Sequence, residues 1–182
     1  MYRYDVGTRL TFRPIDEEDG YLVTKWRNLS VARAAFFNQD VVTPDTHIAF
    51  LANRKEHDLV WMIDLKGTGY SIGMTSLTVN VEAHTAEYGR AFIAPEYTGK
   101  GYATEQEYMV LSFAFEVLRL DSLWGDVLAS NEAVLTLHHK TGWKDAGVDL
   151  PGHTNPRGPV MHITYSQDTW KRARYELTGE FL

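Results

Sequence analysis

Residues 93–104 read Ile-Ala-Pro-Glu-Tyr-Thr-Gly-Lys-Gly-Tyr-Ala-Thr, and the rest of the chain is organised around them. An apolar run ends at Ile93, Pro95 breaks it, and a Gly-Lys-Gly turn leads into a long segment with helical apolar spacing. This order predicts a strand, a tight loop and the start of a helix. Gly99 and Gly101 let the backbone turn sharply, and the first amides of a helix are unpaired and carry partial positive charge. The stretch therefore predicts a phosphate-binding loop, with a plain glycine turn between strand and helix as the alternative.

The composition indicates one globular domain over residues 1–182, without internal repeats. The net charge of −6 argues against bulk electrostatic binding to nucleic acid or to an anionic membrane surface. The absence of cysteine excludes disulfides, thiolate metal sites and a cysteine nucleophile. The sequence shows no signal-peptide pattern, and no apolar run approaches the roughly 20 residues that span a bilayer. We therefore expect a cytoplasmic protein.

Alternation and capping signals predict the elements of the first half. The predicted strands are residues 10–13, 59–65, 70–81 and 87–93, with residues 66–69 as a hairpin turn and the third strand central or bulged. A first helix opens at Pro14 and Asp16 and runs to about residue 28, with Trp26 on its apolar side. A second runs from Thr43 and Pro44, as N-cap and first residue, to about residue 55. We expect it to bury Ile48, Leu51 and Ala52.

The second half is predicted to hold a helix over residues 102–118, with one apolar stripe and with Glu105, Glu107 and Glu116 off that stripe. A strand follows at residues 122–129, and a strand–helix–strand unit of this length predicts parallel pairing. Asn131 is expected to cap a short helix that ends near Gly142. Antiparallel strands at residues 143–148 and 160–166 flank a Gly- and Pro-rich loop. A last helix is expected at residues 168–176, with Trp170 and Tyr175 packing.

Two motifs in this order resemble those of the GNAT superfamily of acyl-CoA N-acyltransferases. The family's loop, Arg/Gln-x-x-Gly-x-Gly/Ala, matches Thr98-Gly99-Lys100-Gly101-Tyr102-Ala103 at its glycine and alanine, whereas Thr98 stands in place of the leading Arg/Gln. Its second landmark, an Asn and then Tyr-x-Lys-x-Gly-Phe, matches Asn131 and His138-His139-Lys140-Thr141-Gly142-Trp143, with His138 in place of Tyr. The resemblance implies an α/β (α+β) fold: a mixed, mostly antiparallel sheet with one splayed parallel pair and helices on both faces.

The resemblance also implies acetyl-CoA as cosubstrate, with its pyrophosphate on the glycine loop and its pantetheine arm between the splayed strands. Backbone N–H groups around Ile93 are expected to polarise the thioester carbonyl. The implied contacts are Phe92, Ile93, Ala94, Gly99, Lys100, Gly101, Tyr102, Ala103, Thr104 and Asn131. Two of these residues have a structural role as the alternative to cofactor binding. For Lys100 it is an exposed lysine in the turn, and for Asn131 it is a helix cap.

Acyl transfer to an amine needs a base, because a free alkylamine is mostly protonated at neutral pH. By the resemblance, Glu87 is the candidate base; a structural carboxylate paired with an arginine is the alternative. His138 is the candidate acid for the departing thiolate, against a structural or surface histidine. No metal is expected, because the histidines at 47, 84, 138, 139, 153 and 162 show no recognised zinc spacing.

The first half is expected to bind a small-molecule amine acceptor through Trp26, Arg27 and His47. The Trp-Arg-Asn at residues 26–28 and His-x-x-Phe at residues 47–50 resemble the amino-sugar N-acetyltransferases of nucleotide-linked sugar pathways. The resemblance therefore implies an amino-sugar acceptor. The alternatives are the ribosomal-protein N-terminal and polyamine acetyltransferases, and, from another class, a non-catalytic acetyl-CoA-binding module. A monomer or a homodimer is expected.

Overall fold

The computed structural model describes residues 4–179, and seven strands of this part of the chain form one sheet in the order β1-β2-β3-β4-β5-β7-β6. The strands are β1 (Leu10–Pro14), β2 (Asp58–Leu65), β3 (Ser71–Asn80), β4 (Thr85–Ile93), β5 (Ser122–Leu128), β6 (Lys144–Val148) and β7 (Val160–Ser166). Neighbours pair antiparallel except β4 and β5, which pair parallel. The predicted mixed sheet with one parallel pair is thus confirmed, as is the turn at residues 66–69. In residues 4–179 no helix is long and apolar enough to cross a membrane.

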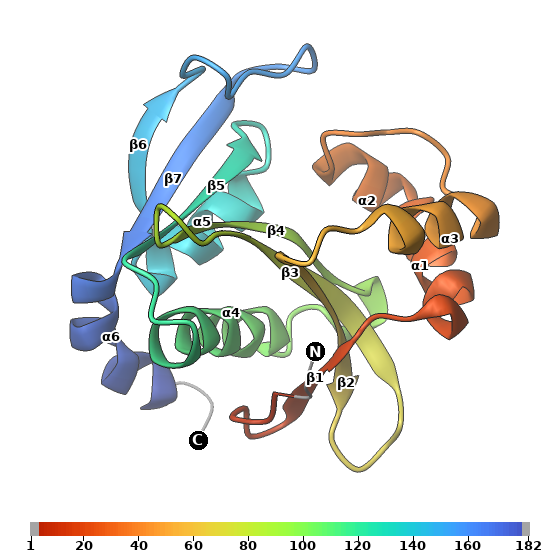
Figure 1. Ribbon diagram of the computed structural model, residues 1–182, viewed down its shortest axis with the longest axis horizontal. Coiled ribbons are helices and arrows are strands. Elements are labelled where there is room, and N and C mark those ends of the chain that lie inside the picture. The colour runs from red at the N-terminus through yellow and green to blue at the C-terminus, as the bar shows by residue number, and fades with distance from the viewer. Residues whose placement is uncertain (1–3, 180–182) are drawn as a thin grey trace.

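The helices lie on both faces of the sheet, as predicted (Figure 1). On the N-terminal side they are η1 (Glu17–Asp19), α1 (Gly20–Arg27), α2 (Ser30–Ala35) and α3 (Pro44–Asn53). Further along the chain are η2 (Pro95–Tyr97), α4 (Tyr102–Ser112), η3 (Phe113–Val117), α5 (Glu132–Thr141) and α6 (Gln167–Gly179). In Figure 1, α4 runs along one side of the sheet, while α1, α2 and α3 form a separate group.

Alternation along β2 separates two hydrophobic layers, because successive side chains point to opposite faces. Trp61 and Ile63 pack in the core that includes Met109 and Val110 of α4. Val60 and Met62 pack in the core that includes Val23 and Trp26 of α1. The position predicted for Trp26, on the apolar side of its helix, is confirmed.

The helix predicted over residues 102–118 differs from the structure in two ways. It is α-helical only to Ser112 and continues as a π-helical turn, η3, on which Val117 is 52% exposed. The prediction that Glu105 and Glu107 lie off the buried stripe is wrong, because both side chains are fully buried. Each carboxylate has a partner that spacing along one helix cannot show: Arg9 for Glu105 and His138 for Glu107. Buried charges are tolerated when they are paired and hydrogen-bonded.

Smaller corrections concern single side chains. Ile48 is 47% exposed and Ala52 is exposed, whereas α3 buries His47, which bonds to the backbone of the preceding segment. Trp170 packs as predicted, but Tyr175 is exposed. Asn131 is the N-cap residue of α5, as predicted, but its side chain makes no capping bond.

Candidate active site

The parting of β4 from β5 opens a cleft in the middle of the sheet. The parallel register runs only from Thr85 and Ser122 to Glu87 and Trp124. Beyond it the two strands diverge, and a cavity of about 270 Å³ lies between residues 87–92 of β4 and residues 125–127 of β5. Asn131, Val134 and His138 of the α5 region line the same cavity. This is the notch that the sequence predicted for a pantetheine arm.

A β-bulge re-aims β4 at this parting. The register with β3 shifts between Met74 and Ser76, and Arg90 on the bulge has a positive φ of 51°. Beyond the bulge, the Ala94 amide donates to Ile72 of β3 at 2.8 Å. Because hydrogen-bonding direction alternates along an antiparallel strand, the Ile93 amide points away from β3, toward the gap left by β5. A free backbone N–H in this position suits a carbonyl oxygen that becomes negatively charged.

The glycine loop at residues 99–101 ends at the start of α4 with its amides open. Gly99 and Gly101 have φ of 73° and 78°, and a Cβ at Gly99 would meet nothing within 4 Å. Gly101 is the N-cap, without a side-chain capping bond, so the amides of Tyr102, Ala103 and Thr104 face outward without intrahelical partners. Lys100 folds back instead, donating to the Glu96 carbonyl at 3.0 Å. Backbone amides, rather than the Lys100 side chain, are therefore the groups that an anion could contact here.

A buried ion pair holds that loop against β1. Glu105 accepts from the Arg9 side chain at 2.7 Å and from the backbone amides of Arg9 and Leu10 at 2.7 and 3.1 Å. Arg9 also donates to the Lys100 carbonyl at 2.9 Å and lies over the Tyr102 ring. Although Glu105 lies in the first turn of α4, its charge is turned toward Arg9, away from the open amides.

Glu87 lies at the last paired position of β4, at the mouth of the cleft. Its carboxylate makes no hydrogen bond or ion pair within residues 4–179, although the charge of Arg90 acts on it, so base and structural carboxylate both stay as predictions. The nearby Arg90 instead bonds Asp58 at 3.0 Å and Ser76 at 3.1 Å. Burial raises the pKa of Glu87, and the Asp126 and Asp58 carboxylates raise it further, against the opposing charge of Arg90. A half-buried carboxylate with a raised pKa is suited to accept a proton near neutral pH.

His138 lies on the opposite wall of the cleft. It is buried, and its Nδ1 donates to Glu107 Oε1 at 2.6 Å. Its ring packs against both Tyr88 and Trp143, with ring centroids at 5.8 and 5.3 Å. Glu107 thereby fixes the imidazole and leaves Nε2 as the nitrogen available for proton transfer. The Glu107 charge, together with burial, raises the pKa of the Tyr88 hydroxyl.

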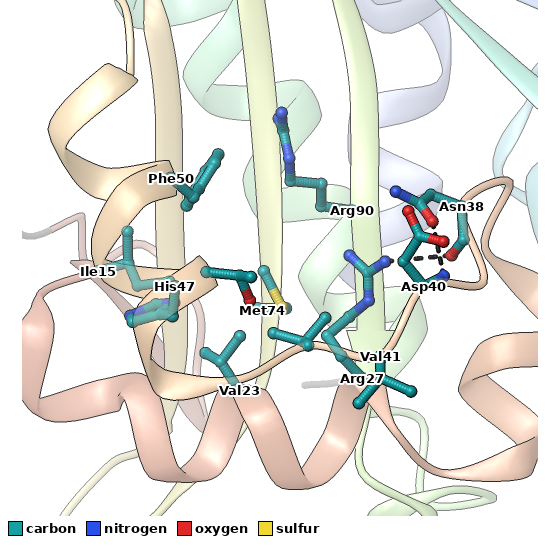
Figure 2. Close-up of a pocket in the computed structure, with 12 residues that line it drawn as sticks. Ile15, Val23, Arg27, Asn38, Asp40, Val41, His47, Phe50, Met74 and Arg90 are labelled. Atoms are coloured by element: carbon teal, nitrogen blue, oxygen red, sulfur yellow. Dashed lines mark hydrogen bonds between the residues drawn. The ribbon is translucent and has the colours of Figure 1, made fainter.

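Arg27 and Arg90 line the cleft and also a second cavity of about 260 Å³ between α1, α3 and β4 (Figure 2). Arg27 stacks on the Phe36 ring at 3.9 Å and forms no ion pair within the described residues. Burial lowers the pKa of Arg27, and the like charge of Arg90 lowers it further. The guanidinium groups of Arg27 and Arg90 therefore line the same cavity.

The other predicted contacts are placed as follows. Phe92 and Asn131 line the cleft, and the Asn131 side chain, not engaged in capping, is available to a ligand. Trp26 is buried beneath Phe92, at 6.0 Å between ring centroids. His47 is buried, with Nε2 3.0 Å from the Asp16 carbonyl oxygen, and only an edge of it lines the second cavity. The positions of Trp26 and His47 therefore favour a structural role beneath the site over direct contact with the acceptor. Ala94 has a similar position, because it is fully buried and its amide is bonded within the sheet.

Several residues of this region were not predicted from the sequence: Asp58, Arg90, Glu107, Asp126, His153 and His162. Asp126 lines the cleft and bonds both His153 and His162. These residues come from separate strands and a loop, so sequence spacing carries no signal of their meeting. A charged residue at an expected inward position of a strand, such as Asp126 on β5, is the only hint.

Comparisons with known proteins agree with this geometry. The family described as "Acetyltransferase (GNAT) domain" matches residues 9–144. A spermidine N(1)-acetyltransferase of Escherichia coli (strain K12) is 28% identical over 139 residues, which cover 74% of this chain and 73% of that protein. A spermidine N-acetyltransferase from Vibrio cholerae, solved with CoA and spermine, has a TM-score of 0.80 at 20% identity, covering 90% and 99% of the chains. A GCN5-related N-acetyltransferase from Brucella melitensis has a TM-score of 0.83 at 13% identity, covering 100% and 86%.

Proposed function

The chain belongs to the acetyltransferase (GNAT) family and is an acyl-CoA-dependent N-acyltransferase, and on this premise we propose that it acetylates a polyamine in the cleft between β4 and β5. The observation that carries the proposal is Glu87, a half-buried carboxylate without a partner among residues 4–179, at the mouth of that cleft. A protonated amine needs such a group, both as counter-charge and as base.

The reaction follows from the positions of the groups. The acetyl-CoA pyrophosphate lies on the amides of residues 102–104, and the pantetheine arm lies in the gap beside β4. The thioester oxygen accepts from the Ile93 amide. Glu87, directly or through a water, takes a proton from the acceptor ammonium. The amine nitrogen then attacks, the N–C bond forms and the C–S bond breaks. His138, acting in its doubly protonated form, gives its Nε2 proton to the departing thiolate. The second amine proton leaves to solvent, and a solvent proton restores His138.

A polyamine fits the negative charge of the acceptor side. Glu87, Asp126 and Asp58 lie close enough for both aspartates to raise the pKa of Glu87. The E. coli relative at 28% identity is a spermidine N(1)-acetyltransferase, which favours this acceptor over the amino sugar and ribosomal protein implied by the sequence resemblance. The acidic run at residues 16–19 has a structural role, because Asp19, just before α1, forms an ion pair with Arg13.

A second candidate is an amine that carries an anionic group, such as a nucleotide-linked amino sugar. Arg27 and Arg90 favour it, because they meet in one cavity that opens beside the cleft, and Arg27 has no carboxylate partner in residues 4–179. Guanidinium groups bind phosphate and carboxylate through paired hydrogen bonds. A polycation gains nothing from them.

An acceptor panel distinguishes the candidates. CoA release is measured with spermidine, spermine, a UDP-linked amino sugar, the unlinked amino sugar and an N-terminal peptide, in wild type and in Arg27→Gln. Polyamine turnover that is unchanged or improved in Arg27→Gln supports the first proposal. Sugar-nucleotide turnover that falls in the same variant supports the second. Tight acetyl-CoA binding without turnover of any amine would point to a non-catalytic module and sink both.

A further inference from the structure

Three metal-binding side chains meet at the edge of the acceptor cleft, although the sequence gives them no recognised spacing. Asp126 projects from β5, His162 from β7, and His153 from the loop that precedes β7. Their ligand atoms all lie within 4.8 Å of one another. We propose that Asp126, His153 and His162 form a binding site for a divalent transition-metal ion.

The distances suit one shared ion. His153 Nδ1 is 2.8 Å from Asp126 Oδ2, and His162 Nδ1 is 2.7 Å from Asp126 Oδ1. With metal–ligand bonds of about 2.1 Å, two adjacent ligands lie about 3 Å apart, so a small movement admits the ion. Each Nδ1 binds the metal through its lone pair, so in the metal-bound form each neutral imidazole carries its single proton on Nε2.

Neighbouring groups fix the orientation of both imidazoles. The Trp124 ring lies against His153 edge-on, at 5.2 Å between centroids, and against His162 at 5.6 Å. The His153 amide donates to the Leu150 carbonyl at 2.8 Å, which fixes the loop. Where the loop joins β7, Asp149 accepts from the Val160 amide at 2.8 Å. Ligands held in place by such contacts lose little freedom on binding metal.

The donor set and surroundings define the class of ion. Two imidazoles and a carboxylate favour Zn²⁺, Co²⁺, Ni²⁺ or Fe²⁺ over Mg²⁺ or Ca²⁺. The side chains of Asp126 and His162 are 13% and 12% exposed, and that of His153 is 28% exposed, so the ion keeps access to solvent. Asp126 also lines the cleft, and Glu87 contributes a further negative charge on that side. The site therefore borders the cleft through Asp126.

Metal binding is tested without any acceptor, so its outcome is separate from that of the proposed function. Untagged protein is titrated with Co²⁺, with visible absorption as the readout, and Zn²⁺ is then added as a competitor. We expect one Co²⁺ per chain, displaced by Zn²⁺. His162→Gln and His153→Gln should each weaken binding by more than about 100-fold, because even outer-shell changes cost about 10–100-fold.

His139→Gln is the matched control, because His139 and Asp145 form an exposed pair at 2.7 Å without a second imidazole. It should bind Co²⁺ as wild type does. Zn²⁺ should also raise the melting temperature of wild type and of this control, but not of the two site variants. If His162→Gln does not fold, His153→Gln on the loop carries the test. No saturable Co²⁺ signal, binding retained in both site variants, or binding lost in His139→Gln would overturn the proposal.

Discussion

The buried carboxylate of Glu105 is predicted to set both the stability of the fold and the shape of the glycine loop. Its two oxygens have different partners: Oε1 accepts from the backbone amides of Arg9 and Leu10, and Oε2 accepts from the Arg9 guanidinium. Glu105→Gln can therefore keep the Oε1 bonds while placing an N–H donor against Arg9. Glu105→Ala loses all of these bonds, together with a longer one of 3.4 Å from the Thr8 hydroxyl to Oε1.

The two variants should therefore lose different amounts of unfolding free energy. A hydrogen bond to a charged group contributes about 1.5–3 kcal/mol; because the Arg9 side chain is 38% exposed and can be hydrated, Glu105→Gln should lie at the low end. At about 2–4 °C per kcal/mol for a chain of this size, the melting temperature falls about 3–6 °C. Glu105→Ala also leaves two backbone amides unsatisfied at about 1–3 kcal/mol each. A loss of about 5 kcal/mol then lowers the melting temperature by about 10–20 °C.

Thermal unfolding followed by circular dichroism measures these shifts, and calorimetry measures acetyl-CoA binding. Both variants should weaken acetyl-CoA, because Arg9 bonds the Lys100 carbonyl in the loop. Glu132→Gln, in the exposed first turn of α5, is the matched control and should change the unfolding free energy by less than about 1 kcal/mol. Equal shifts for Glu105→Gln and Glu105→Ala would refute the division between the two oxygens. Shifts no larger than that of Glu132→Gln would refute the role of Glu105 in holding the glycine loop against β1.

Three further predictions concern the cleft. Because burial raises the pKa of Glu87 and the base acts when deprotonated, kcat/KM should rise with pH through that raised value; Glu87→Gln should remove this acidic limb, and a profile identical to wild type would exclude Glu87 as the base. His138→Phe keeps an aromatic ring against Tyr88 and Trp143 but removes the proton donor, so kcat should fall about 100-fold with acetyl-CoA affinity unchanged. Glu107→Gln, which still accepts from His138 Nδ1, should lower kcat less; an unchanged pH–rate profile in both variants would contradict the assignment. Gly101→Ala should weaken acetyl-CoA and cost about 1–2 kcal/mol for its left-handed backbone, whereas Gly67→Ala, with a φ of 73° in the open β2–β3 turn, should cost similar stability without changing affinity.

The order of elements was predictable from local signals. The glycines of the loop, the Thr43-Pro44 start of α3 and Gly142 at the end of α5 all occur where backbone geometry requires them. The parallel pairing of β4 with β5 also follows, because a helix of the length of α4 joins them. Such signals depend on neighbours along the chain, which the sequence displays directly.

Buried charge was not predictable in the same way. Periodicity placed Glu105 and Glu107 on the solvent side of α4, yet both are buried, because Arg9 and His138 approach from 96 and 31 residues away in the sequence. The same limit applies to Asp126, whose partners lie on β7 and in the loop before it. Helical spacing predicts which face of a helix is buried only from the residues of that helix. A counter-charge from a distant part of the chain allows a carboxylate to be buried on a face where spacing alone does not place it.

The two halves of the cleft therefore constrain specificity differently. The cofactor half is made mainly of backbone groups, the open amides after Gly101 and the bulged end of β4, and any sequence that keeps the glycines and the bulge can form it. The acceptor half is made of side chains from separate elements, including Arg27, Glu87, Arg90 and Asp126. The charges of these four side chains sum to zero, so a single substitution gives a net positive or a net negative charge without any change in the backbone. A relative with the same fold at 20% identity can therefore differ in these side chains. On the proposed function, we expect the charge of Arg27 against that of Glu87 and Asp126 to select the acceptor.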